Sequence, residues 1–396
     1  MSWTSGTERT APAGPTGGAP RPPGWWAGID AARGLALIGL MSAQMLSGHH
    51  AVTRAPAWPH LLLSDASVAL FTLLAGVGLA HGSGGRFPHT GRWRAADRAG
   101  TAVRAVLIAV VGLGIGALMP EDAPGDNLLL SCAVLFVLAV PFLHLSAPAL
   151  FVGAAVLGMA GPLLAQGLAG VLPAPASAHP ALADVLADPG GTVSRLLVDG
   201  TYPVLPYLTC LLVGLGLGRM PLRDTGVQVR LLAAGAGLVV LARTADTVVP
   251  HAVGSHGRVL TSGGTGADEL GQVLARGADP WPVSGVGEIV AGLGVALLVL
   301  GSCLLASRRS GAWSLRLSAV GATTLSLYTA HLVALSAEVR YDLSVLWSVA
   351  HLGAAVLVAI GWHRARGRGP FERILDAGGD ATRRTVLRAV AQRSRR

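Results

Sequence analysis

The sequence predicts an all-α polytopic membrane protein, a bundle of about ten transmembrane helices with both ends of the chain in the cytoplasm. Of the 396 residues, 52% are hydrophobic and only 13% are charged, whereas a soluble protein carries about a quarter charged residues. The mean hydropathy is +0.56, and the apolar residues gather in stretches near the ~20 residues that a helix needs to cross a bilayer. The sequence does not show the alternating segments typical of a β-barrel.

Ten stretches have the length and apolar character of membrane spans. They are predicted near residues 28–47, 61–82, 101–119, 127–144, 148–171, 203–219, 228–248, 284–306, 317–337 and 345–363. Glycines recur inside them, as in the runs beginning at Gly112 and Gly214, and we expect these small residues to let helices pack closely. The stretches 148–171 and 228–248 are candidates for broken helices.

The positions of the arginines predict the orientation of the bundle. All 30 basic residues are arginine, and cytoplasmic connections of membrane proteins are enriched in such residues. Arginines are dense in 84–100, around 219–230, around 308–316 and in 364–396, and sparse in the alternate connections. The net charge of +9 therefore reflects membrane topology, and no nucleic-acid partner is expected.

Three regions follow from composition. Residues 1–24 are rich in Pro, Gly, Ala and Thr and lack a signal-peptide pattern, so a disordered leader is expected. Residues 25–369 form the transmembrane domain, and 370–396 form a basic tail able to lie as an amphipathic helix on anionic lipid. The three cysteines fall inside spans, where buried apolar roles are expected, and they are Cys132, Cys210 and Cys303.

Two charged residues open the first span. Asp30 and Arg33 are three residues apart, so they share one face of a helix at its cytoplasmic end. One interpretation is a local ion pair that anchors the span. The other is that the arginine binds an anionic ligand that arrives from the cytoplasm.

Polar residues gather at the opposite, outer side. Ionisable residues inside spans are costly and are functional candidates by default. Asp65, Glu288 and His331 are expected at similar depth, which predicts a shared polar cavity. Other polar or histidine residues predicted near this mouth are His49, His50, His60, Tyr202, Tyr207, Ser284 and Tyr328. Their spacing does not match a metal site, and no metal is expected.

At this point the sequence resembles the heparan-α-glucosaminide N-acetyltransferase family of the transmembrane acyltransferases. The resemblance lies in an Asp-x-x-Arg-Gly at the first span, then a Trp seven residues before an Asp, then an aromatic-rich second span with a glycine. The matching residues are Asp30, Arg33, Gly34, Trp58, Asp65, Phe71 and Gly76. The later segments "GTYPVLPYLTCLLVGLGLGR" and "LSLYTAHLVAL" look like the bacterial branch.

The resemblance implies a reaction and a division of roles. Known members move acetyl groups from cytoplasmic acetyl-CoA to a glucosamine amine on the far side of the membrane. Asp30, Arg33 and Arg86 would then hold the nucleotide end of acetyl-CoA or another acyl-CoA. Gln44, Trp58, Tyr202, Tyr207, Ser284, Glu288 and Tyr328 would contact the substrates. A base near the outer mouth would deprotonate the acceptor.

Two positions depart from the family pattern. The family's catalytic histidine lies three residues before the tryptophan, and Ala55 stands there in this chain. The family's asparagine in the first span corresponds to Gln44, which keeps an amide on a longer arm. His60, His50 or His331 would then serve as base, with His60 favoured because it follows Trp58 closely and precedes Asp65 by five residues.

Together with the two polar zones, the resemblance implies a plasma-membrane acyltransferase that acts on an extracytoplasmic sugar or other amine or hydroxyl acceptor. Two alternatives stay open. One is a catalytically silent scaffold of the same family, which Ala55 would explain. The other is a transporter for a small solute. The lipid bilayer is the expected partner, and the sequence leaves a homodimer open.

Overall fold

The computed structural model describes residues 24–53, 58–121, 123, 126–169, 171–174, 177–261, 283–308, 312–337 and 344–393. These residues form helices and connecting turns, with no strand among them. The elements are α1 (Gly24–Thr53), α2 (Trp58–Gly82), α3 (Gly91–Gly116), α4 (Leu128–Ala139), η1 (Val140–Phe142), α5 (Ala147–Ala169), α6 (Leu182–Ala187), α7 (Pro189–Ser194), η2 (Arg195–Asp199), α8 (Val204–Gly218), α9 (Thr225–Thr261), α11 (Val283–Ala306), α12 (Ala312–Gly321), α13 (Thr324–Ser336), α14 (Ser344–Arg366) and α15 (Pro370–Arg393).

Within this described part, five helical segments are long and apolar enough to cross a membrane. They are Ser64–Gly82, Gly91–Gly116, Thr225–Ala245, Gly287–Ala306 and Leu346–Arg366. Three shorter apolar segments, Leu128–Phe142, Ala147–Gly161 and Val204–Gly218, pack among them. The chain is therefore a helical membrane protein. The predicted leader, residues 1–24, lies outside the described residues apart from Gly24, which begins α1.

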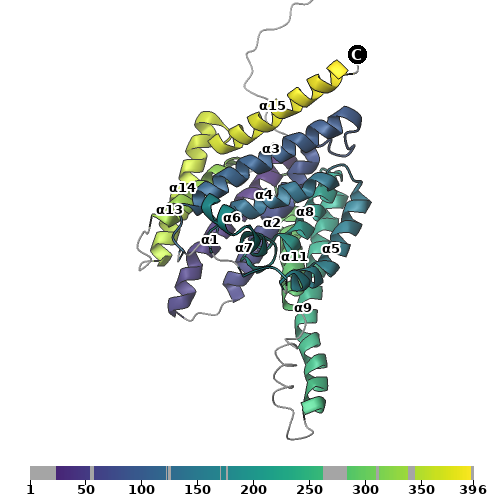
Figure 1. The fold of residues 1–396 in the computed structure, drawn as a ribbon, viewed down its shortest axis with the longest axis vertical. Coiled ribbons are helices and arrows are strands. Elements are labelled where there is room, and N and C mark those ends of the chain that lie inside the picture. The colour runs from purple at the N-terminus through teal and green to yellow at the C-terminus, as the bar shows by residue number, and fades with distance from the viewer. Residues whose placement is uncertain are drawn as a thin grey trace, which may run out of the picture.

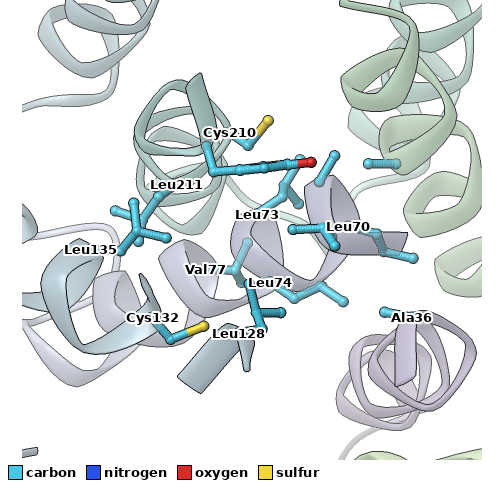
Figure 2. Close-up of a cluster of buried hydrophobic side chains, with 14 of the residues drawn as sticks. Ala36, Leu70, Leu73, Leu74, Val77, Leu128, Cys132, Leu135, Cys210 and Leu211 are labelled. Carbon is cyan, nitrogen blue, oxygen red and sulfur yellow. The ribbon is translucent and has the colours of Figure 1, made fainter. Parts of the chain in front are cut away.

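The centre of the bundle is α2, which packs against α1, α8 and α11. Figure 2 shows part of this core, where leucines of α2 face α8 on one side and α4 on another. Cys132 of α4 and Cys210 of α8 lie within it, and Cys303 of α11 is also buried. The expectation that the three cysteines serve as small buried apolar residues is confirmed.

Glycines allow the close approach of α2 and α8. A Cβ atom added at Gly76 would lie 2.2 Å from the carbonyl oxygen of Leu211, and one added at Gly214 would lie 1.9 Å from that of Leu73. Neither distance is possible for a real side chain, so these two helices touch backbone to backbone. The expected packing role holds for both positions, whereas Gly114 of the run in α3 faces open space.

The predicted span 317–337 is wrong as a single helix. It is divided into α12, which ends at Gly321, and α13, which begins at Thr324. Gly321 packs against the backbone of Asp30, and the Thr323 hydroxyl donates back to the carbonyl oxygens of Ala319 and Val320. Such back-bonding competes with the regular helix pattern. By contrast, residues 148–169 of the stretch 148–171 lie in one continuous helix, α5, and the stretch 228–248 lies within the continuous helix α9.

The basic tail forms the amphipathic helix α15, which lies along α3 (Figure 1). Arg383 pairs with the buried carboxylate of Asp97 at 2.7 Å, and Arg104 of α3 pairs with Asp376 at 3.4 Å. One face of the tail is therefore fixed to the bundle. Binding of its other face to anionic lipid stays a prediction.

Candidate active site

Gln44 of α1 lies at the centre of a buried polar group. Its side chain is only 3% exposed. Its Nε2 atom donates to the carbonyl oxygen of Asp126 at 2.9 Å and to the Tyr328 hydroxyl at 3.1 Å, and lies 3.5 Å from the Tyr202 hydroxyl. The Tyr328 hydroxyl also donates to the Asp126 carbonyl at 3.0 Å. One amide thus ties α1 to α13 and to the segments before α4 and α8.

His331 of α13 completes this group and is 1% exposed. Its Nε2 atom lies 3.2 Å from Gln44 Oε1, and its Nδ1 atom lies 2.9 Å from Nε2 of His351 on α14. Because the Gln44 amide nitrogen faces oxygen acceptors, its oxygen faces His331, which must donate from Nε2. In a neutral His331 the Nδ1 lone pair then accepts from His351. We call Gln44, Tyr202, Tyr328, His331, His351 and the Asp126 carbonyl the Gln44 cluster.

Asp65 of α2 belongs to an adjoining group. The Tyr207 hydroxyl donates a hydrogen bond to the Asp65 carboxylate. Tyr207 is also close enough to the Glu288 carboxylate to interact with it electrostatically. The rings of Tyr202 and Tyr207 meet edge to face with centroids 6.5 Å apart. Asp65 is therefore linked to Gln44, and through it to His331, by way of the two tyrosines. No direct hydrogen bond between Asp65 and His331 is found among the described residues. Glu288 is exposed and near this group on α11.

Several predicted residues lie outside the described part of the structure. His60 and Trp58 fall at the start of α2, and Ser284 at the start of α11, where only the backbone is described. His49 and His50 fall near the end of α1 in the same way, and Ala55 lies in the undescribed connection 54–57. Their predicted roles are untested.

A small cavity of about 30 Å³ borders the Gln44 cluster. Tyr202 lines it, together with Asp126, Asn127 and Arg195. Arg195 donates to the Asp126 carboxylate at 3.1 Å, so the carbonyl of Asp126 faces the cluster while its side chain holds an arginine at the cavity. This volume suits about one or two water molecules.

The other end of α1 carries the predicted ion pair. Arg33 donates to Asp30 at 2.9 Å, as the interpretation of a local pair expected. The Arg33 guanidinium lies beside Gly78 of α2 and in electrostatic range of His81, whose ring is in tilted contact with the rings of Trp25 and Trp26. Asp30 and Gln44 are 14 residues apart on one helix, so the two polar zones are separated by about 21 Å along its axis.

Arg86 does not join Arg33 through any contact found among the described residues. It is exposed in the turn after α2, with its guanidinium 5.9 Å from the ring centre of Phe87. Arg219, at the end of α8, is instead buried at this end of the bundle. It donates to the carbonyl oxygens of Ala80 and Leu143 and to the Ser83 hydroxyl, which fixes the turn between α2 and α3.

Sequence reasoning missed three residues of these groups. Asp126 acts through its backbone carbonyl, which no residue pattern reveals. His351 carries a signal that the sequence does show, because it is a histidine in the middle of an apolar stretch. For Arg219 the sequence indicates only the orientation of the bundle, because it does not show that the side chain is buried.

The sequence was also compared with known proteins. The family model described as "Heparan-alpha-glucosaminide N-acetyltransferase, catalytic" matches residues 26–245. This match spans α1 to the first part of α9 and includes Asp30, Arg33, Gln44, Asp65 and Tyr202. The comparison with curated proteins finds no match.

Proposed function

This chain belongs to the heparan-α-glucosaminide N-acetyltransferase family, and on that premise we propose that it is a membrane acyltransferase. It transfers an acetyl or other acyl group from acyl-CoA on the cytoplasmic side to an amine or hydroxyl of a sugar or other acceptor outside the cytoplasm. The observation that carries the proposal is the Gln44 cluster, because buried hydrogen-bonding groups deep in an apolar bundle are costly and usually functional.

The proposed topology has ten spans in the plasma membrane, with both ends of the chain in the cytoplasm. The α12–α13 pair forms one broken span. The arginine-rich connections then lie inside, together with Arg33 and α15, and the cavity beside Tyr202 opens toward the outside. The donor and the acceptor reach the bundle from opposite sides.

At the inner end, Arg33 and the neighbouring arginines would bind the phosphates of acyl-CoA. Arg223 lies 5.0 Å over the ring of Trp25, and the indole rings of Trp25 and Trp26 offer flat apolar surfaces beside it. Cationic and aromatic groups of this kind suit a nucleotide. The acyl-bearing arm would extend along α1 toward Gln44.

At the Gln44 cluster, the amide of Gln44 would exchange its hydrogen bond to the Asp126 carbonyl for one to the oxyanion that forms at the thioester carbonyl, and the Tyr202 hydroxyl would be the second donor. His331 holds Gln44 in the orientation that points its amide nitrogen toward oxygen atoms. The acceptor nitrogen or oxygen would bond to the carbonyl carbon as its proton passes to a base. The carbon–sulfur bond then breaks, and the departing thiolate takes the proton to give the CoA thiol.

His60 is the first candidate for the base and His331 the second. His60 lies one turn before Ser64 on α2, and the Ser64 hydroxyl contacts Tyr202. His331 is at the cluster itself, but its Nε2 proton is directed at Gln44 and its lone pair at His351. Separate variants of the two histidines distinguish these roles.

The proposal is tested with purified protein in nanodiscs, radiolabelled acetyl-CoA and a panel of amino sugars. We expect acetyl-CoA to raise the Tm and an acceptor to become labelled. Gln44→Leu should lower the transfer rate by about 100-fold, the usual loss for one oxyanion donor. Gln228→Leu is the matched control, because Gln228 is equally buried but bonds Arg308 away from the cluster.

Loss of activity in His60→Ala with retention in His331→Ala would assign the base to His60, and the reverse would assign it to His331. A protein that neither binds nor hydrolyses acetyl-CoA would contradict the proposal. That result would favour a catalytically silent scaffold, for which the alanine at position 55 is the motivating observation.

A further inference from the structure

The helix α13, which carries Tyr328 and His331, begins inside the protein, directly after the short turn that separates it from α12. Its first residue is Thr324, and the preceding Thr323 occupies the position where a side chain normally caps the free amides of a helix. The Thr323 hydroxyl bonds backward to α12 instead and makes no capping bond to α13. The first turn of α13 therefore needs another acceptor.

Glu372 of the tail helix α15 supplies this acceptor. Its Oε1 atom accepts from the backbone amides of Leu325 at 2.6 Å and Ser326 at 3.1 Å, and its Oε2 atom accepts from the Ser326 hydroxyl at 2.5 Å. The Ser326 hydroxyl in turn accepts from the Phe371 amide at 3.1 Å. A carboxylate at this place satisfies free amides and complements the positive end of the helix dipole.

The cap is held firmly because α15 is anchored elsewhere. Arg383, three turns further along α15, reaches the buried Asp97 of α3. Gly369, just before α15, packs so closely that an added Cβ would lie 2.0 Å from Glu372 Oε2 and 2.5 Å from the Ser326 hydroxyl. Only a glycine at this position leaves room for the contact.

The distance from the cap to the Gln44 cluster is short. Ser326 precedes Tyr328 by two residues and His331 by five on the same helix, which corresponds to about 3 Å and 7.5 Å along the axis. A small shift or rotation of the first turn of α13 would therefore move the partners of Gln44.

We propose that Glu372 is a positioning residue that fixes α13 and so sets the alignment of Tyr328 and His331 against Gln44. The effect on catalysis rests on the proposed function, whereas the effect on α13 does not. The basic tail would therefore contribute to the geometry of the site, because Glu372 near its start holds the first turn of α13.

The test is hydrogen–deuterium exchange of the full-length protein in nanodiscs, followed at the amides of residues 324–328. We expect exchange about fivefold to tenfold faster in Glu372→Ala, the loss of one helix cap. Glu372→Gln should fall between this variant and the wild type, because its amide oxygen still accepts. Gly369→Ala should also accelerate exchange, because it displaces Glu372 without changing charge.

Two matched controls separate this effect from general damage. Asp380→Ala removes a carboxylate from the same helix that contacts only Arg104, at 3.9 Å, among the ion pairs found in the described residues. Gly361→Ala adds a methyl group where a Cβ meets open space. Both should exchange like the wild type at 324–328.

Where acetyl transfer is measurable, Glu372→Ala should lower kcat about tenfold with a much smaller change in KM for acetyl-CoA, because the hydrogen bonds found for Glu372 go to α13 and none goes to Arg33. If the amides of residues 324–328 exchange at the wild-type rate in both Glu372→Ala and Gly369→Ala, the proposal is overturned. Faster exchange in a protein without any acetyl-CoA activity would uphold the role of Glu372 and refute only the proposed function.

Discussion

Buried polar side chains in this protein differ in how many hydrogen-bond partners they have. Gln44 and His331 each use both polar ends of the side chain for hydrogen bonds. His179, in the connection between α5 and α6, is 4% exposed, yet neither ring nitrogen has a hydrogen-bond partner among the described residues. Burial of an imidazole without a partner disfavours its charged form. The pKa of His179 is accordingly lowered from its ordinary value of 6.5, chiefly by burial.

A pH-dependent stability follows from this residue. Below pH 6.5 His179 is protonated in the unfolded chain but stays neutral in the folded protein, because its folded pKa is lower. The free energy of unfolding therefore falls as the pH decreases toward the folded pKa. His179→Leu should therefore lose less Tm than the wild type between pH 7.5 and pH 5.5. The measurement is thermal unfolding of detergent-solubilised protein at several pH values. Substitution of the exposed His363 by leucine is the control, and equal slopes for the wild type and His179→Leu would contradict the assignment.

At the scale of elements, two kinds of contact hold the bundle. Apolar side chains fill the core around α2, whereas glycines let α2 touch α8, and α9 touch α11, through their backbones. Because lipid is as apolar as leucine, such close packing contributes much of the association between membrane helices.

The crossing of α2 and α8 gives a direct prediction. Gly214→Leu places a side chain against the Leu73 carbonyl, so the helices must separate, at a cost of about 1–3 kcal/mol for overpacking. We expect a lower Tm and a smaller yield of monodisperse protein. Gly114→Leu is the control, because a Cβ at Gly114 meets open space. A Tm for Gly214→Leu equal to that of Gly114→Leu would show that the two backbones do not approach as described.

At the scale of the whole molecule, the proposed function requires the Arg33 end of the bundle to face the cytoplasm and the cavity beside Tyr202 to face the outside. The proposed topology puts α15 in the cytoplasm and α6 outside. Single cysteines at Thr385 and Leu186, both exposed, test this in a variant whose three native cysteines are replaced. A membrane-impermeant maleimide should label position 186 in intact cells and position 385 only after permeabilisation. Labelling of both positions in intact cells would refute the orientation.

Part of the site could be predicted from the sequence and part could not. Tyr328 and His331 share a helix face three residues apart, and their common location was predictable from that spacing. His331 and Gln44 are separated by 287 residues, and Gln44 and Tyr202 by 158. Their contact depends on how α1, α8 and α13 are rotated about their axes. Helices that are apolar on nearly all sides carry no sequence pattern that specifies this rotation.

The sequence by itself determined that this chain is a helical membrane protein and that its polar residues fall in two zones. Both follow from local quantities, the length and apolarity of each stretch and the order of charges along it. The tertiary structure decided that one predicted span is broken at 322–323, that Glu372 caps its second half, and that the backbone of Asp126 completes the Gln44 cluster. These features arise from contacts between segments that are far apart in the sequence. The energies of such contacts depend on distances of a few ångströms, which no single segment determines.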